Sequence, residues 1–459
     1  MTSLNRDLDV RSLLRLDEGL VHSDVYASPE VFDLEMERIF HQGWVYVGHE
    51  SEIPKNGDYV LRWIGRQSVI MNRDSRAKLH LFMNRCRHRA STVCELEQGN
   101  TQSFHCHYHG WTYGNDGKLE VVPYAEGAYG ADFDKGNFPL IEPRMEVYRG
   151  FVWGKLTPKG MSLKEHLGPI GLKSIDLFCD ASPEGEIIVQ QGCLKGVIYA
   201  NWKFQGGDGY HPPITHQAAF LGMRAKRRGE RNPISGGGLI EDGILSRDLG
   251  NGHYCLDTRS GPRGIKLPDT TWAKKYREDM IKAYGVERAE YLIRTGGNPH
   301  TIFMPNLHLV NTSDLRVLKP IAVDKFELYF YCPFLKGVPH ELNEARLRDV
   351  EDRMGPAGSI NPDDVEMFER NQLGMRQTLE PWKYMARGMD REFIDDDAKT
   401  PEPYRRDGTL TGHYSDELNQ RAQLRWWAEY LSQPSRAADE KATMQRTSPQ
   451  RAAKQRVAR

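Results

Sequence analysis

The residues of this chain best suited to metal chemistry form two short cysteine–histidine pairs. Cys86 and His88 are separated by one residue, Cys106 and His109 by two, and seventeen residues lie between the pairs. Each pair offers one thiolate and one imidazole, which are ligands of iron–sulfur clusters and of zinc. Gly110-Trp111 follows the second pair directly. The spacing predicts one metal centre built from two loops.

Two interpretations of these four ligands are open. Two thiolates on one iron and two imidazoles on the other make the Rieske [2Fe–2S] arrangement, which raises the reduction potential. A structural zinc site could use the same ligand types, although its first pair is normally Cys-x2–4-Cys. The Cys-x-His and Cys-x-x-His-Gly-Trp pattern favours the Rieske cluster over zinc.

A second candidate metal site lies further along the chain. His211 and His216 are five residues apart, and Asp208 stands three residues before the first. Pro212-Pro213 ends or kinks any helix there, which lets His216 turn back toward His211. With a carboxylate from Asp363-Asp364, two histidines form the facial triad of an oxygen-activating ferrous site. The alternative is surface or core histidines, with acids that simply match a helix dipole.

The bulk composition indicates a large enzyme that binds neither nucleic acid nor a membrane. The chain has 459 residues, 39% hydrophobic and 27% charged, so two domains are expected. Its net charge of -1 gives no argument for nucleic acid or an anionic membrane as partner. No apolar signal or membrane-spanning stretch is visible, and the seven cysteines show no framework. These features predict a cytoplasmic protein with reduced cysteines.

Local patterns predict the elements that position the candidate ligands. Ser28-Pro29-Glu30 predicts a helix start, and the helix should run to about His41. Turn residues separate three β-type runs before the first pair, and glycines at 114–117 predict a turn after the second. The predicted strands are 59–64, 68–72, 79–83, 150–154, 186–190, 316–322 and 327–332; the predicted helices are 270–284, 341–353 and 363–377.

These elements divide the chain into four parts of class α+β. We expect an N-terminal segment, 1–39, packed on the catalytic domain, and a small all-β domain at 40–157. A larger domain, 158–433, should hold the second metal site. Residues 434–459 carry seven Lys or Arg, two acids and few apolar side chains, which predicts disorder.

Over roughly residues 20–380 the chain resembles the large (α) subunits of Rieske non-haem iron ring-hydroxylating oxygenases, and most closely the benzoate-type dioxygenases. Both cluster pairs carry the resemblance, with segments such as Asn201-Trp202-Lys203, Asp208-Gly209-Tyr210-His211 and Pro362-Asp363-Asp364. It implies a β-rich Rieske domain and a catalytic domain whose antiparallel sheet wraps a helix.

The resemblance also implies roles for individual residues. His211, His216 and Asp364 match the ligands of a mononuclear Fe(II), with Asp363 as the second choice for the acid. Asp208 matches a carboxylate that bonds a cluster histidine of the neighbouring subunit, here His109 of the partner subunit. One departure is that only Phe204-Gln205-Gly206-Gly207 precedes Asp208, where the family usually has a longer stretch containing Glu-Asn.

The implied activity is reductive oxygen activation. NAD(P)H would feed electrons through a reductase, or a reductase with a ferredoxin, and O2 would add to an aromatic substrate as a cis-dihydrodiol. The family forms trimers of α subunits, frequently with three small β subunits. Two alternatives stay open: a Rieske monooxygenase or demethylase, and a Rieske electron-transfer protein without catalysis. His308 is expected to be a core or surface histidine whose hydrogen bonds are satisfied.

Overall fold

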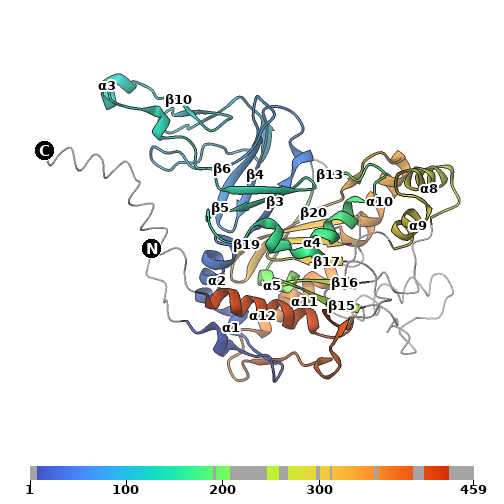
Figure 1. Ribbon diagram of the computed structural model, residues 1–459. Helices are drawn as coiled ribbons and strands as arrows, with labels where there is room; N and C mark the ends of the chain where they lie inside the picture. Colours follow the sequence, from blue (N-terminus) through green and yellow to red (C-terminus); the bar gives the residue numbers. More distant parts are fainter. Residues whose placement is uncertain are drawn as a thin grey trace.

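The computed structural model describes residues 8–189, 193–206, 245–257, 267–295, 300–310, 313–355, 358, 361–395 and 408–433 (Figure 1). Asp208, His211, His216 and the tail predicted at 434–459 lie outside these residues. No helix among the described residues is both long and apolar enough to cross a lipid bilayer.

The small β domain consists of three antiparallel sheets. The first has the order β6-β5-β4-β7, the second β10-β9-β8, and the third β11-β12-β3. Their bounds are β3 Val45–His49, β4 Asp58–Ile64, β5 Gln67–Arg73, β6 Leu79–Met83, β7 Gln98–Asn100, β8 Ser103–His105, β9 Thr112–Gly114, β10 Leu119–Val121, β11 Arg144–Tyr148 and β12 Phe151–Lys155, with short helices η3 Glu50–Glu52, α3 Ala125–Tyr129 and η4 Lys135–Asn137. The strands predicted at 59–64, 68–72 and 79–83 are confirmed.

The large domain is built on one nine-stranded antiparallel sheet, in the order β14-β20-β19-β18-β17-β16-β15-β24-β23. The bounds are β14 Leu194–Ile198, β15 Leu245–Gly250, β16 His253–Asp257, β17 His300–Phe303, β18 Leu307–Val310, β19 Asp314–Ala322, β20 Lys325–Tyr331, β23 Phe393–Asp395 and β24 Thr409–His413. A separate pair joins β13 Ile187–Ile188, shorter than predicted, to β21 Phe334–Leu335.

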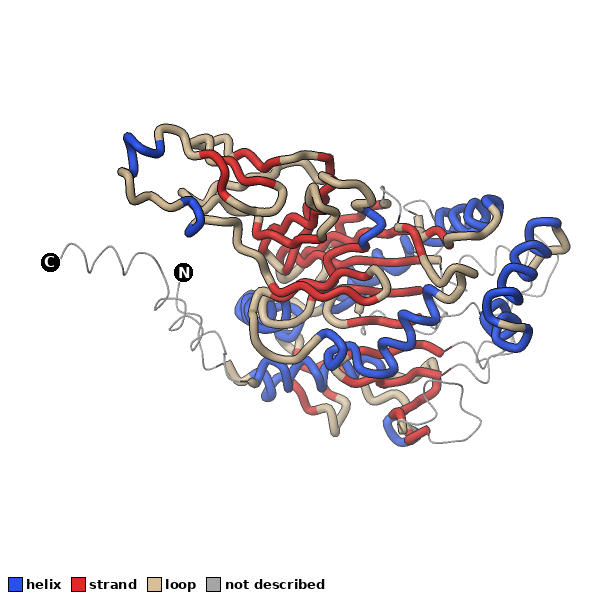
Figure 2. The backbone as a smooth tube through the Cα atoms, turned by 45° about the horizontal axis from the view of Figure 1, so that its top comes forward, coloured by secondary structure: helices blue, strands red, loops and turns tan. Residues whose placement is uncertain are grey.

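Helices cover both faces of this sheet (Figures 1 and 2). Their bounds are α4 Leu163–Cys179, α5 Trp202–Gln205, α8 Thr271–Tyr284, α9 Val286–Thr295, α10 His340–Met354, α11 Asn361–Gly374, η8 Met389–Arg391 and α12 Leu418–Ser432. Leu424 and Trp427 of α12 belong to one buried core, whereas Leu167 and Phe178 of α4 belong to a second core on the other face. The predicted α+β architecture with an antiparallel sheet is confirmed.

The N-terminal segment packs on the large domain. It contains η1 Val10–Leu13, α1 Asp24–Ala27, α2 Pro29–Glu35 and η2 Met36–Phe40, and strands β1 Leu14–Arg15 and β2 Leu20–His22, which join β22 Trp382–Tyr384. The Ser28 hydroxyl accepts a hydrogen bond from the Val31 N–H at the start of α2. The helix predicted from Ser28-Pro29-Glu30 is therefore confirmed.

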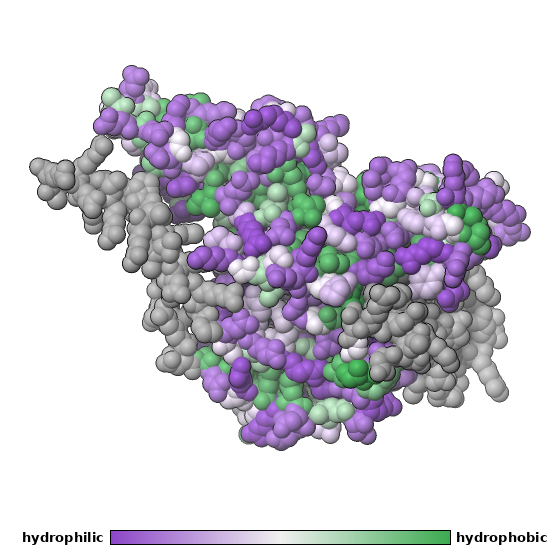
Figure 3. All heavy atoms as spheres, viewed as in Figure 1, coloured by the Kyte–Doolittle hydropathy of each residue, from purple (hydrophilic) through white to green (hydrophobic). Residues whose placement is uncertain are grey.

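The two domains share a buried core. One apolar cluster contains Val47, Ile64 and Met71 from the small domain together with Leu318 and Leu328 from the large sheet. Figure 3 shows apolar side chains gathered on the near face where the small domain meets the large sheet, below a mostly hydrophilic tip. The two sequence-defined domains are thus in close apolar contact.

Candidate metal centres

Two loops of the small domain carry the four predicted cluster ligands. Cys86 and His88 lie in the loop that follows β6, and Cys106 and His109 lie between β8 and β9. The backbone N–H of Cys86 donates to a carbonyl of its own loop at 2.7 Å, and that of Cys106 does so at 2.8 Å. These bonds hold each loop closed around its cysteine.

The four side chains come together as a histidine couple and a cysteine couple. The rings of His88 and His109 have centroids 4.6 Å apart, and the Nδ1 atom of each is buried without a hydrogen-bond partner in the described structure. Cys86 and Cys106 are 1% and 2% exposed. Burial raises the pKa of Cys106, and the Cys86 thiol beside it adds to the rise.

This donor set fits a [2Fe–2S] cluster. A buried nitrogen without a partner is unfavourable, so two such Nδ1 atoms side by side indicate a missing ligand partner. A Rieske cluster takes two cysteines on one iron and two histidines on the other, so the cysteine couple and the histidine couple match its two ends.

Tyr113, which the sequence did not single out, bonds the cysteine side of this centre. It is fully buried in β9, and its hydroxyl accepts the Arg87 N–H at 2.9 Å. The same oxygen lies 3.3 Å from the Cys86 sulfur. Either atom could donate in this bond, but a cluster-bound cysteine sulfur carries no proton, so the Tyr113 hydroxyl would donate to Cys86 when the cluster is bound.

The outer faces of the two histidines differ. The Tyr129 hydroxyl lies 3.3 Å from Nε2 of His88, whose ring stacks on Trp111 at 5.0 Å and 9°. In the described structure no group hydrogen-bonds the Nε2 of His109, which has the exposed ring of Tyr108 beside it at 3.8 Å. His109 is therefore the histidine open to a partner.

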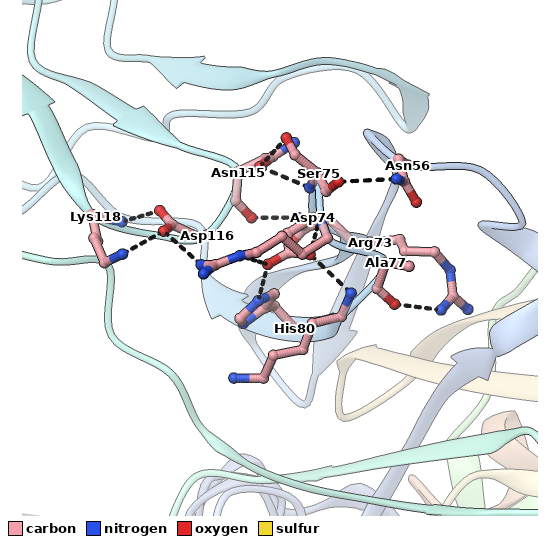
Figure 4. A network of polar contacts seen from close by, with 12 residues as sticks. Asn56, Arg73, Asp74, Ser75, Ala77, His80, Asn115, Asp116 and Lys118 are labelled. Atoms are coloured by element: carbon pink, nitrogen blue, oxygen red, sulfur yellow. Dashed lines mark hydrogen bonds and ion pairs between the residues drawn. The ribbon is translucent and has the colours of Figure 1, made fainter.

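A polar network supports the turn behind the second loop (Figure 4). Asp74 accepts the Lys78 N–H at 2.8 Å and lies 3.2 Å from His80, while Arg76 reaches Asp116 in the β9–β10 turn. Gly117 has φ +82 there, which confirms the turn predicted at 114–117. The hydrogen bond to Glu142 raises the pKa of His80; burial opposes it, and Asp74 reinforces it.

Asp364 is the one predicted ligand of the mononuclear iron that lies within the described structure. It lies in the first turn of α11, half-buried, with its Oδ1 atom fully buried. Phe368, one turn later on the same face, stacks on Phe204 of α5 at 6.3 Å and 12°. The face of α11 that carries Asp364 and Phe368 therefore packs on α5, whose last residue, Gln205, stands three residues before Asp208 in the sequence.

A buried ion pair anchors α5. Lys203 and Glu35 are 1% and 0% exposed, and their charged atoms lie 2.6 Å apart. Glu35 also accepts the indole N–H of Trp202 at 2.8 Å and that of Trp427 at 2.7 Å. The N-terminal segment, α5 and α12 therefore meet at one carboxylate.

The expectation for His308 is confirmed only in part. His308 is buried in β18 as a core residue, but its Nε2 has no hydrogen-bond partner in the described part of the chain. Strand alternation alone could not show this, because it does not tell which polar atoms lie around the buried ring. The sequence analysis also missed Tyr113, Glu35 and Tyr129. Glu35 and Tyr129 stand beside no recognisable motif, and only the position of Tyr113, four residues after His109, could have suggested a role.

Comparison with known proteins agrees with this architecture. Residues 43–134 match the family model of the Rieske [2Fe-2S] domain. The chain is 34% identical over 390 residues to the anthranilate 1,2-dioxygenase large subunit of Acinetobacter baylyi, spanning 80% of this chain and 79% of that protein. It is 36% identical to the toluate 1,2-dioxygenase subunit alpha of Pseudomonas putida, over 76% and 78% of the two chains.

A solved structure shows the same fold. The naphthalene 1,2-dioxygenase from Rhodococcus sp., bound to indole, superposes with a TM-score of 0.78 at 26% identity, covering 94% of this chain and all of that one. Fold and site thus define a Rieske-type oxidoreductase with a [2Fe–2S] centre. The chain belongs to the family of Rieske aromatic-ring-hydroxylating dioxygenase large subunits.

Proposed function

We propose that this chain is the terminal oxygenase component that converts an aromatic carboxylate of the benzoate type to a cis-dihydrodiol. The observation that carries the proposal is the buried pair of unpartnered Nδ1 atoms on His88 and His109, beside two buried cysteines. The similarity to anthranilate and toluate dioxygenase subunits supports an aromatic acid as substrate.

Cys86 and Cys106 would hold one iron of the cluster, and His88 and His109 the other. His211, His216 and Asp364 would hold the mononuclear iron. A bound cluster supplies single-electron storage, and a bound ferrous ion supplies open coordination positions for oxygen and substrate chemistry. The protein residues orient the substrate, exclude water and hold protons around these centres.

Asp208 would link the two centres across a subunit boundary. Its proposed partners are His211 in the same chain and His109 of the partner subunit, which requires an assembly of several copies of this chain, and we propose that this assembly is a trimer. The open Nε2 face of His109 supports that arrangement. A reductase or ferredoxin as electron donor, a small β subunit and the cytoplasmic location predicted from the sequence belong to the same proposal.

The decisive experiment is turnover of benzoate-type acids under labelled oxygen with the reconstituted reductase. A dioxygenase places both atoms of one O2 molecule in the product, whereas a monooxygenase or demethylase places one. The purified protein should be reddish-brown, with cluster iron and sulfide and one further iron per chain. A colourless, zinc-loaded and active preparation would contradict the cluster assignment.

Variants separate the proposed roles. Asp364→Ala should lose the mononuclear iron and keep the visible spectrum of the cluster, whereas Asp363→Ala should keep both. Asp208→Asn should keep both metals but slow the reoxidation of the pre-reduced cluster in single-turnover stopped-flow measurements. A wild-type reoxidation rate in that variant would remove Asp208 from the electron route.

A further inference from the structure

A group of buried polar side chains lies on the large sheet, away from both proposed ligand sets. His308 on β18 and Asp314 and Arg316 on β19 are 1%, 1% and 4% exposed. His308 is paired directly with Arg316 in the strand register, so both side chains stand on one face of the sheet. Apolar Phe330 and Met354 surround the group. Burying such polar groups in an apolar setting calls for a reason.

The hydrogen bonds within this group are incomplete. Two nitrogens of Arg316 approach the same Oδ2 atom of Asp314: Nε donates to it at 2.9 Å, and Nη2 lies 2.8 Å from it. Its Nη2 also faces the weakly accepting sulfur of Met354 at 3.1 Å. The Oδ1 of Asp314 and the Nε2 of His308 are buried without a partner in the described structure. A purely structural ion pair would satisfy these atoms.

Arg316 supplies the positive charge of this group. Burial lowers the pKa of His308 well below its ordinary value and that of the neighbouring His300 to about 3, so both imidazoles are neutral at physiological pH. A neutral His308 can offer one ring N–H, and Arg316 has a second edge, at Nη1, that makes no hydrogen bond to a described residue. A guanidinium edge beside an N–H donor matches the geometry of a carboxylate.

The face on which these residues stand is also the face on which α5 and α11 pack. Helix α5, which leads into the segment with Asp208, packs against β19 on this side. Phe204 of α5 and Phe368 of α11 stack together, and Phe330, Met354, Phe204 and Phe368 belong to one buried core. Met354 ends α10, and α11 begins seven residues later with Asp364 in its first turn. Arg316, through Phe330 and Met354, and Asp364, one turn before Phe368, therefore both adjoin members of this core.

We propose that Arg316, assisted by His308, binds the carboxylate of the aromatic acid and thereby orients its ring toward the iron held by Asp364. Asp314 orients the guanidinium and balances its charge while the substrate is absent. This inference rests on the proposed function, because it assigns the substrate-recognising group of that same site. It makes Arg316 a specificity-determining residue that acts on substrate charge.

The test compares benzoate with its neutral isostere benzamide, using metal-loaded holoenzyme and the reconstituted reductase. Arg316→Met should raise KM for benzoate by about 10- to 100-fold, the effect of losing a charged hydrogen bond, while KM for benzamide stays within about twofold. Asp314→Asn should raise kcat/KM for benzoate relative to kcat/KM for benzamide, because it removes the negative charge that neutralises Arg316.

Arg247→Met is the matched control. Arg247 is also a buried arginine of this sheet, bonded to Asp257 and Asp395. Its side chain, however, lies on the face of the sheet opposite to the one that carries Leu256, His300 and Arg316. Its loss should not change the preference between acid and amide. Thermal unfolding and the cluster spectrum report whether each variant is folded, and Arg316→Lys, which keeps the charge and loses the fork geometry, should raise KM for benzoate less than Arg316→Met does.

Four results would overturn the inference. Equal losses for benzoate and benzamide in Arg316→Met, or an unchanged preference in Asp314→Asn, would reduce the group to a structural ion pair. A wild-type enzyme that oxidises benzamide but not benzoate would refute carboxylate recognition and leave the oxygenase function standing. A fully metal-loaded wild type that oxidises no aromatic compound of either kind would refute the proposed function itself, and this inference with it.

Discussion

At the scale of single residues, the hydroxyl of Tyr113 tunes the centre without being a ligand. Its hydrogen bond to Cys86 places positive charge density beside a sulfur whose negative charge grows when an iron is reduced. Hydrogen bonds to cluster sulfurs are among the determinants of reduction potential. We therefore expect Tyr113→Phe to shift the midpoint potential to a more negative value, measured by redox titration of the visible spectrum.

Tyr108→Phe is the control for this shift. It also removes one hydroxyl from the cluster loops, but that hydroxyl makes no hydrogen bond to any described residue, while the ring beside His109 stays in place. Its potential should equal that of the wild type. An unchanged potential in Tyr113→Phe with an intact spectrum would show that the hydroxyl does not donate to Cys86.

At the scale of elements, α5 is anchored by the buried ion pair between Lys203 and Glu35, two residues that are far apart in the sequence. Lys203→Met leaves Glu35 buried with two indole donors and no counter-charge, and breaking such a pair costs about 3–5 kcal/mol. We expect that loss in the free energy of unfolding from denaturant titration. Lys195→Met, which removes an exposed lysine paired with Glu97, should change it by less than about 1 kcal/mol.

The β5–β6 hairpin carries a pH-dependent contribution through His80. Its folded-state pKa is raised by Glu142 and Asp74, so the stability that it adds is complete below the unfolded pKa. That stability is lost as the pH rises through the raised folded value. Unfolding titrations should show the wild type losing stability in this window, and His80→Gln should flatten the curve there. A slope that persists in His80→Gln would assign the effect to another group.

Local sequence signals predicted the elements whose ends are marked by helix-capping or turn residues. The Ser28-Pro29 start, the turn at Gly117 and the β runs around it appear within a few residues of their predicted positions. Helix α4 was missed because Gly168-Pro169 interrupts it, with Gly168 at φ +65, so no continuous helical period is visible. The cluster ligands were predictable from spacing, whereas Tyr113 and Glu35 act through partners that only tertiary packing supplies.

At the scale of the whole molecule, Asn306 joins the two domains. Its side chain accepts the Tyr46 N–H at 3.0 Å and donates to the Tyr46 carbonyl at 2.9 Å, so it pairs with β3 as a neighbouring strand would. The residue is 2% exposed, and around it the apolar core runs continuously from Val47 to Leu318. We infer that the small and large domains unfold together, as one cooperative transition in calorimetry.

Asn306→Ala should weaken this coupling, because it leaves the buried N–H and carbonyl of Tyr46 unpaired at a cost of about 2–4 kcal/mol. Asn343→Ala is a matched control: Asn343 makes the same two bonds, at 2.8 and 2.9 Å, to Leu335 within the large domain. Both variants should lower the Tm, but Asn306→Ala alone should separate the loss of cluster absorbance from unfolding of the large domain. If the two signals stay coincident in Asn306→Ala, the shared apolar core by itself joins the domains.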